Sequence, residues 1–530
     1  MSQDVVHDNT IHALLARQAG RYGQREFLRF GEASYSFADM EQKSRQAAAG
    51  LQSLGVGKGD KVAILMGNRP EYLFLWFGLS MLGAVEVPIN IAHRGKLLSY
   101  MLDQADCTTA VVEAPLLERL TSALPDLPKL KRVVMVGQPE QVPTNLPGPA
   151  FYHQIVDNDG RFDELKVIWS DPFGIMFTSG TTGPSKGALM PQNYALYMGE
   201  MVSQMGGYGE DDCLYNALPL FHGNAQFLST MPALMSGARM VLAPRFSASR
   251  FWEEVRAYSC TEFNYIGSIL PILLKAEPQP DDADNPLRLM VGAGCPPDLF
   301  EVVEKRFGVI LVEGYGMSEL GLPLVNSVDN RKKGTIGRAA PGYRVKVVND
   351  HDVEVDDGVT GELIVRPQNP FTMMLEYYRM PQATLESWRD LWFRTGDYVV
   401  RGSDGNYLFV DRKKDALRRG GENISSFEVE AIINSHPAVM ECAAVAAKSE
   451  LAEDEVMVCV VLKPDHELPV EGLMDYCQEN MAYFMVPRYV RFMEKLPKTP
   501  TLRVQKVELR KQGVTADTWD RVEAGYQVKR

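Results

Sequence analysis

The sequence lacks any cysteine pattern that would indicate a disulfide framework or a zinc site. Its seven cysteines are scattered, odd in number and contain no CxxC pair. Such usage is typical of a reducing compartment. The first residues have neither the basic nor the apolar region of a signal peptide, and no apolar run reaches the roughly 18 residues that a membrane span needs. We therefore expect a cytoplasmic protein without a membrane-spanning segment.

An excess of positive charge is missing as well. The net charge is −13, which argues against a general nucleic-acid binder, because such a protein presents a basic face. A small anionic ligand held by a few local donors remains compatible with this charge. The phosphate-binding pattern GxxxxGK[ST] does not occur anywhere in the chain, so a P-loop NTPase is excluded.

The length and the hydrophobic pattern predict an α/β protein of more than one domain. At 530 residues the chain exceeds one ordinary core. Short apolar strands alternate with helices up to about residue 335, as in the strand 61–66 and the helix 71–82. This alternation is typical of a parallel sheet covered on both faces. From there, short alternating strands at 344–348, 362–366 and 407–410 predict a small antiparallel β-subdomain.

The carboxyl-terminal part has the pattern of a separate, smaller α+β domain. We expect a helix at 426–435, strands at 441–447 and 456–462, and a helix at 470–480. The predicted domains are therefore residues 1–410, with parallel-sheet α/β subdomains and the β-subdomain, and residues 411–530.

A loop of small residues follows the apolar strand 173–177. Glycines let backbone N–H groups face a ligand, hydroxyls add donors, and a lysine supplies a point charge, so the loop is suited to phosphate oxygens. A surface turn is the alternative. The predicted phosphate-binding residues are Thr178, Ser179, Gly180, Thr181, Thr182, Gly183 and Lys186.

Three further segments carry polar and glycine residues in patterns that suit a nucleotide. In residues 313–319 two glycines flank a tyrosine, which suits a ring stacked on backbone, and Glu319 is a candidate ligand for Mg²⁺. Residues 394–397 end in Asp397, which could accept from ribose hydroxyls. The charged residues 411–415 lead to a glycine-rich segment. A core tyrosine, a solvated aspartate and a solvated linker are the respective alternatives.

Taken in order, these segments resemble the motifs of the adenylate-forming superfamily, which includes acyl- and aryl-CoA synthetases, amino-acid-activating adenylation domains and firefly luciferase. The resemblance covers essentially the whole chain, and among these enzymes the chain most resembles the carnitine/crotonobetaine-type CoA ligases. It implies that a carboxylate attacks the α-phosphate of ATP, giving an acyl-adenylate and pyrophosphate. A mobile carboxyl-terminal domain then rotates and a thiol takes the acyl group. The implied ligands are ATP, Mg²⁺ and coenzyme A.

The resemblance also assigns roles to individual residues. Asp397 and Arg412 match the ribose contacts, Gly420 and Gly421 the loop along the pantetheine arm, and Lys414 the hinge. The positions that match the adenine site are Gly292, Ala293, Gly294, Glu313, Gly314, Tyr315, Gly316, Met317 and Ser318.

One departure from the family pattern concerns the catalytic lysine near the carboxyl terminus. The family reads Pro-Lys-Thr-x-Thr-Gly-Lys, whereas here Leu502 stands in place of the glycine and Arg503 in place of the lysine. Either Arg503 supplies the charge or Lys506 takes the role, and the sequence slightly favours Lys506. Solvated surface cations are the alternative for both, since arginine does not simply replace lysine.

The segment 218–224 resembles the part of the family that lines the mouth of the acid pocket. It contains no aspartate to pair an α-ammonium group, which disfavours amino acids. His222 is expected beside the carboxylate, although a buried structural histidine is the alternative. The other pocket residues are mostly apolar, so we expect an apolar or lightly substituted acid, and no aromatic cage for a quaternary ammonium is evident. These residues are Asn224, Tyr265, Ile266, Gly267, Gly321, Leu322 and Pro323.

Three functions are therefore open. The first is an acyl-CoA ligase of organic or fatty acid metabolism. The second is an adenylating enzyme that loads a carrier-protein thiol, which we consider less favoured because no carrier domain follows residue 530. The third is a non-catalytic nucleotide-binding relative, which the Leu502–Arg503 departure keeps open.

Overall fold

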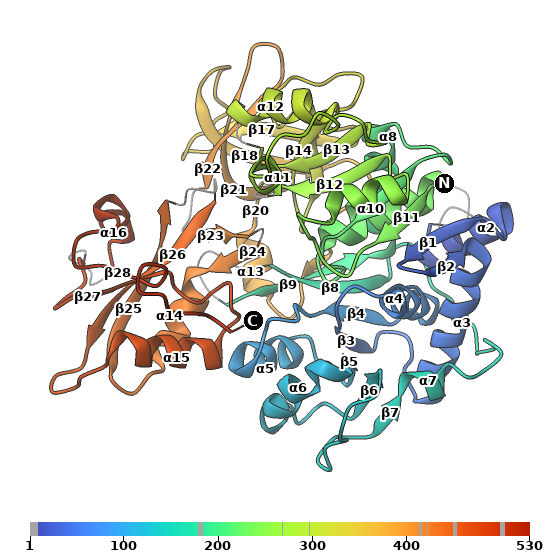
Figure 1. Ribbon diagram of the computed structural model, residues 1–530, viewed down its shortest axis with the longest axis horizontal. Coiled ribbons are helices and arrows are strands. Elements are labelled where there is room, and N and C mark those ends of the chain that lie inside the picture. The colour runs from blue at the N-terminus through green and yellow to red at the C-terminus, as the bar shows by residue number, and fades with distance from the viewer. Residues whose placement is uncertain are drawn as a thin grey trace. The chain divides into compact units, whose positions relative to one another are not determined.

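The computed structural model describes residues 9–178, 184–267, 269–295, 297–412, 416–420, 422–448, 453–498 and 504–529 (Figure 1). The chain divides into two compact units, each of which is made of several segments. The first unit comprises Met1–Ile91, Leu102–Met176 and Gly187–Asp411. The second comprises Ala92–Met101, Phe177–Lys186 and Arg412–Arg530.

An eight-stranded sheet carries the strand that leads into the predicted phosphate loop. Its order is β19 (Glu376–Tyr377), β9 (Lys186–Pro191), β8 (Pro172–Thr178), β4 (Val85–Pro88), β3 (Lys61–Leu65), β5 (Thr109–Glu113), β6 (Arg132–Val136) and β7 (Pro149–Phe151). From β8 to β7 every printed pairing is parallel, as the sequence predicts. Its connecting helices are α4 (Pro70–Leu82), α5 (Gly95–Gln104), η1 (Ala114–Leu116), α6 (Leu117–Ala123), η2 (Leu124–Asp126) and α7 (Tyr152–Ile155).

Helix α4 accounts for the longest apolar run in the sequence, because it is a buried helix. Pro70 stands at its first position, and Gly83, with φ of 62°, ends it in the left-handed conformation that glycine tolerates best. Almost every residue between is buried, because the helix is covered on all sides by other elements. In the described parts of the chain, no helix is both long and apolar enough to cross a membrane.

A nine-stranded sheet carries the residues matched to adenine and to the acid pocket. Its order is β16 (Arg338–Ala339), β15 (Gly321–Val325), β14 (Ile310–Met317), β13 (Leu289–Ala293), β12 (Glu262–Ile266), β10 (Cys213–Asn216), β11 (Arg239–Leu242), β1 (Glu26–Phe30) and β2 (Ala33–Ser36). The strands from β14 to β1 pair in parallel, and β15 returns antiparallel to β14. Its helices are α2 (Ile11–Tyr22), α3 (Phe37–Ser53), α8 (Gln192–Gly206), the π-helical turn η3 (Ala225–Thr230), α9 (Met231–Ser236), α10 (Phe251–Ala257), α11 (Ile269–Leu274) and α12 (Pro297–Phe307).

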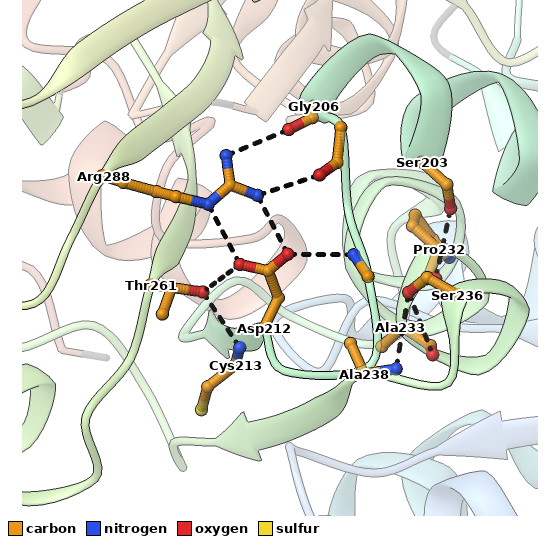
Figure 2. Close-up of polar contacts among 12 residues, drawn as sticks. Ser203, Gly206, Asp212, Cys213, Pro232, Ala233, Ser236, Ala238, Thr261 and Arg288 are labelled. Carbon is orange, nitrogen blue, oxygen red and sulfur yellow. Dashed lines mark hydrogen bonds and ion pairs between the residues drawn. The ribbon is translucent and has the colours of Figure 1, made fainter.

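A charged cluster joins the residues that precede β10, β12 and β13 (Figure 2). The Arg288 guanidinium donates to both oxygens of Asp212, over 3.0 Å and 2.9 Å, and its remaining donors reach the carbonyls of Gly206 and Gly207. Thr261 donates to the same carboxylate over 2.7 Å. Burial alone would raise the pKa of Asp212, but the hydrogen bonds from Arg288 and its neighbours hold it below its ordinary value.

The predicted antiparallel β-subdomain is present and completes the first unit. It is a five-stranded sheet with order β17 (Tyr343–Val348), β18 (Thr360–Pro367), β21 (Trp392–Arg401) and β20 (Trp388–Arg389), to which β22 (Tyr407–Arg412) adds on β21. Its described pairings are antiparallel. The short helix α13 (Pro381–Glu386) precedes β20.

The second unit contains the predicted α+β arrangement. The expected elements occur as α14 (Ser426–Asn434), β25 (Val439–Lys448), β26 (Asp454–Leu462) and α15 (Val470–Asn480). The sheet β25–β26–β27–β28 is completed by β27 (Tyr489–Phe492) and β28 (Trp519–Asp520), and a hairpin joins β23 (Ala416–Arg419) to β24 (Glu422–Ser425). Helix α16 (Lys506–Gln512) packs on β25. The predicted α/β fold class with a smaller α+β part is confirmed.

The seven cysteines are buried free thiols. Two of them, Cys213 and Cys260, lie with their sulfur atoms 3.6 Å apart at the start of neighbouring strands. The described residues therefore contain no disulfide framework, in agreement with the sequence pattern.

Candidate functional site

The residues matched to the adenine and ribose motifs are in direct contact. Tyr315 lies on β14, and its hydroxyl donates to Oδ2 of Asp397 on β21 over 2.6 Å. The Tyr315 ring also lies roughly parallel to Phe409 of β22, with 6.4 Å between centroids. Two motifs far apart in the sequence thus meet through one hydrogen bond, next to an aromatic surface on which a base could stack.

Glycine is required beside Tyr315 because β15 runs close to β14. A Cβ atom at Gly316 would lie 2.3 Å from the carbonyl oxygen of Gly321, and one at Gly314 would lie 3.1 Å from that of Leu324. Met317, half-buried, pairs with Gly321, and Ser318 begins the turn between the strands. Leu322 and Pro323 are buried on β15, so this hairpin brings residues predicted for adenine together with residues predicted for the acid pocket.

Glu313 is held by a tyrosine that reaches across a glycine on the strand between them. Tyr265 on β12 pairs with Gly292 on β13, which pairs with Glu313 on β14. The Tyr265 hydroxyl donates to Oε1 of Glu313 over 3.0 Å, and the backbone N–H of Cys295 donates to the same oxygen over 2.6 Å. A Cβ atom at Gly292 would lie 2.8 Å from the Tyr265 ring, so only glycine leaves room for this contact.

Burial dominates the electrostatics of this pair. It raises the pKa of the Glu313 carboxyl, while the hydrogen bonds from Cys295 and Tyr265 work in the opposite direction. Burial also raises the pKa of Tyr265 well above its ordinary value. The tyrosine therefore stays a neutral donor, and Glu313 acts as a buried acceptor at the carboxyl end of the sheet.

The carboxyl ends of β12 and β13 are packed backbone to backbone. A Cβ atom at Gly267 would lie 2.2 Å from the carbonyl oxygen of Gly294, whose φ is 85°. Ala293 and Ile266 end these two strands and are half-buried. In open α/β sheets ligands bind outside the carboxyl ends of strands, which is where these four residues lie.

Glu319, the predicted magnesium ligand, is buried and linked to the strand after the phosphate loop. The Tyr377 hydroxyl donates to its Oε1 over 2.8 Å, and Tyr377 on β19 pairs with Ala188 on β9. Burial and the nearby Glu319 raise the pKa of Tyr377. The described residues contain no group of three or more metal-binding side chains. A single carboxylate oxygen nevertheless suits Mg²⁺, which takes most of its ligands from phosphate and water.

The structure describes both ends of the phosphate loop, whereas Ser179, Gly180, Thr181, Thr182 and Gly183 lie outside the described residues. Thr178 donates to the carbonyl of Lys186 over 3.5 Å. Within the second unit, the N–H of Ser185 donates to Oε1 of Glu428 over 2.8 Å, and its hydroxyl contacts the same oxygen. Burial raises the pKa of Glu428.

The segment 218–224 is fixed by buried amides. The Nδ2 of Asn68 donates to the Leu218 carbonyl over 2.9 Å, and its Oδ1 accepts from the Leu220 N–H over 2.8 Å. His222 is half-buried, with its ring 4.8 Å from that of Phe221. Asn224 Oδ1 accepts a 2.5 Å hydrogen bond from Asn264 Nδ2.

Asn68 and Asn264 are not among the residues that the sequence predicted for the site. Asn264 could have been found, because it is an uncharged polar residue inside the otherwise apolar run Phe263–Ile266 of a central strand. Asn68 follows a strand in an unremarkable loop, and nothing in its sequence context indicates a contact with residues 218–220.

The candidate catalytic cation Lys506 is engaged inside the second unit. Its Nζ lies 2.6 Å from Oε1 of Glu430 and donates to the Ser426 hydroxyl over 2.8 Å. Arg503, Lys414 and Gly421 lie outside the described residues. Arg412 ends β22, and Gly420, with φ of 59°, forms the turn between β23 and β24.

Comparison with known proteins gives matches along nearly the whole chain. The family described as AMP-binding enzyme matches residues 15–378, and its carboxyl-terminal domain family matches residues 428–502. A curated relative, the crotonobetaine/carnitine–CoA ligase of Salmonella typhimurium, is 28% identical over 519 residues, which covers 96% of this chain and 100% of the relative.

Solved structures share the fold at lower identity. The amide bond synthetase McbA from Marinactinospora thermotolerans is 22% identical with a TM-score of 0.80, and covers 94% of this chain and 99% of its own. The o-succinylbenzoate CoA synthetase MenE from Bacillus subtilis is 23% identical with a TM-score of 0.79, and the match covers 94% of this chain and 98% of its own. The predicted superfamily and the enzyme class of AMP-forming acid–thiol ligases are confirmed. The chain belongs to the family of AMP-binding enzymes.

Proposed function

We propose that this enzyme activates a carboxylic acid with ATP to an acyl-adenylate and transfers the acyl group to coenzyme A, giving acyl-CoA, AMP and pyrophosphate. The observation that carries the proposal is the contact between Tyr315 and Asp397. It brings an aromatic ring suited to a base and a carboxylate suited to ribose hydroxyls within one hydrogen bond of each other, as a nucleoside requires.

In the first half-reaction the chain holds ATP and orients its α-phosphate. The β- and γ-phosphates are bound by the loop Thr178–Gly183 and by Lys186. Tyr315 stacks on adenine. The ribose hydroxyls are bound by Asp397, which accepts their hydrogen bonds, and by Arg412. Glu319 is the residue that would hold Mg²⁺. When bound, this ion would neutralise part of the phosphate charge. The buried Glu313 and the glycines 292 and 294 border the adenine, where a close backbone is an advantage.

The acid lies against segment 218–224, with His222 beside its carboxylate. The mostly apolar residues Ile266, Leu322 and Pro323 surround its acyl chain, and neither a carboxylate nor an aromatic cage for a cation is among the residues assigned to this pocket. A cation near the carboxyl terminus assists attack on the α-phosphate. The ion pair of Lys506 with Glu430 moves our preference to Arg503, since Lys506 would first have to leave its partner.

In the second half-reaction the pantetheine arm passes Gly420 and Gly421, and Lys414 is the proposed hinge about which residues 411–530 reorient. Free coenzyme A is favoured as acceptor because the curated relatives are named as CoA ligases. A carrier-protein thiol remains the alternative acceptor, and a non-catalytic nucleotide binder the alternative class.

A panel of carboxylic acids tests the proposal. Purified enzyme is incubated with ATP, Mg²⁺ and each acid, and pyrophosphate and AMP are measured with and without coenzyme A. We expect acid-dependent pyrophosphate release, and AMP turnover that rises when coenzyme A is added. Absence of pyrophosphate with every acid would support the non-catalytic relative, and activation without any response to coenzyme A would support another acceptor.

A further inference from the structure

A buried amide on the central strand β12 is only partly satisfied. Asn264 has no exposed surface, and its Nδ2 donates to Asn224 Oδ1 over 2.5 Å and to the Ser229 hydroxyl over 3.4 Å. Its own Oδ1 is buried and has no hydrogen bond among the described residues. An unpaired buried carbonyl of this kind costs about 1–3 kcal/mol, so an apolar side chain would be the more stable choice at this position.

The orientation of Asn264 follows from the strand. Successive side chains of a strand point to opposite faces, so Asn264 faces the π-helical turn η3 while Tyr265 faces Glu313. Turn η3 packs on both β10 and β12 and begins immediately after Asn224. Asn264 therefore reaches the end of segment 218–224 from inside the sheet, where it can set the conformation of a residue in the acid pocket.

The hydrogen bond fixes which end of the Asn224 amide is available. Asn224 is half-buried, and its oxygen is taken by Asn264. The NH₂ group lies on the other side of the amide and makes no hydrogen bond within the described part of the chain. An amide held in this way presents a neutral donor of fixed direction to the pocket that we propose for the acid, whose other assigned residues are mostly apolar.

We propose that the Asn224–Asn264 pair recognises a neutral oxygen acceptor on the acyl chain of the acid, with Asn224 as the contacting residue and Asn264 as its positioning residue. The inference rests on the proposed function, because it names the substrate class of that same site. The Asn224–Asn264 pair selects acids with a keto, hydroxyl or ether oxygen over alkyl acids of equal length. It also disfavours a trimethylammonium group, because the amide NH₂ carries partial positive charge.

The test compares matched acids in the pyrophosphate-release assay. Straight-chain alkanoates of four to eight carbons are paired with keto and hydroxy acids of the same length, with the oxygen at each position in turn, and crotonobetaine is added as the cationic acid. We expect kcat/KM to be roughly tenfold higher for the best oxygenated acid than for its alkyl partner, the value of about one neutral hydrogen bond. Equal values for all pairs, or a preference for crotonobetaine, would overturn the inference.

Two variants separate positioning from folding. Asn264→Leu fills the same space without the unpaired oxygen, so we expect a melting temperature that is equal or higher, together with loss of most of the tenfold preference. Asn224→Leu, at a half-buried site, removes the contacting donor and gives the same loss. Retention of the preference in both variants would refute the assignment even if activity stays high.

Ser229→Ala is the matched control. It removes the second and longer hydrogen bond of Asn264 and leaves the bond to Asn224 in place. We expect the preference for the oxygenated acid to persist in this variant, and its loss would contradict the role of Asn224. If no acid at all releases pyrophosphate, the proposed function fails, whereas activity without discrimination defeats the further inference alone.

Discussion

Tyr315 on β14 donates its hydroxyl proton to Asp397 on β21, and the two side chains belong to different motifs of the predicted nucleotide site. The hydrogen bond holds the carboxylate in one direction before any ligand arrives. Such preorganisation lowers the ordering cost of binding. It also couples a side chain suited to the base with one suited to the sugar.

Tyr315→Phe should weaken ATP binding while the aromatic surface stays. We expect KM for ATP to rise about three- to tenfold, because one hydrogen bond that orients Asp397 is lost, with a smaller change in kcat. Steady-state kinetics of pyrophosphate release measures both constants. Tyr526→Phe is the matched control, since it removes a tyrosine–carboxylate bond to Asp475 in the second unit. An equal effect of both changes would contradict the role of Tyr315.

Gly292→Ala should destabilise the protein by collision with its neighbouring strand. The added Cβ would lie 2.4 Å from the carbonyl oxygen of Tyr265 and 2.8 Å from its ring, so backbone has to move. We expect a loss of about 1–3 kcal/mol in the free energy of unfolding, the usual range for overpacking. Denaturant titration measures it. Gly57→Ala, where a Cβ meets nothing within 4 Å, should leave stability nearly unchanged.

The two cations near the carboxyl terminus should differ in what their removal affects. Lys506→Ala leaves Glu430 without its ion-pair partner, so we expect a loss of about 1–3 kcal/mol in stability. Arg503→Ala should slow pyrophosphate release about 100-fold or more, as expected when a charge that acts on the transition state is removed. Thermal unfolding and single-turnover adenylation are measured on both variants. A larger kinetic loss in Lys506→Ala would reverse the assignment.

Stability should fall in acid partly through Asp212. Because the folded pKa of this carboxyl is lowered, its ionised form stabilises the fold above the unfolded pKa of about 4, and that contribution is lost as the pH falls through the folded value. Between pH 6 and pH 3, the free energy of unfolding should fall in both proteins, but by about 1 kcal/mol less in Asp212→Asn than in the unaltered protein. Asp126→Asn, at an exposed site, is the control. Parallel pH profiles for Asp212→Asn and the unaltered protein would contradict the prediction.

Local patterns were enough to predict most of the elements. The strand predicted at 61–66 is β3, and the helix predicted at 71–82 is α4, which begins at Pro70 and ends before Gly83. These signals depend only on neighbouring residues, so they are visible in one sequence. The class of the fold followed from the alternation of strands and helices.

Contacts between distant segments could not be predicted in the same way. The pairing of Tyr377 with Ala188 joins strands far apart in the chain, and no local rule specifies it. Glu319 and Tyr315 were identified by resemblance, but their hydrogen bonds with Tyr377 and Asp397 emerge only from the folded chain. The partner of Lys506 is the sharpest case, because no local pattern in the sequence predicts its ion pair with Glu430.

The path of Tyr265 across Gly292 has a consequence for engineering this enzyme. Tyr265 was assigned to the acid pocket, yet its hydroxyl ends on Glu313 beside the predicted adenine site. A designer who shortens Tyr265 to admit a bulkier acid would at the same time strip a donor from a buried carboxylate. In the proposed site, acid selectivity and nucleotide affinity would therefore share one side chain, and a library that varies position 265 alone would explore both at once. Independent adjustment would have to begin at residues such as Asn224, which faces away from that network.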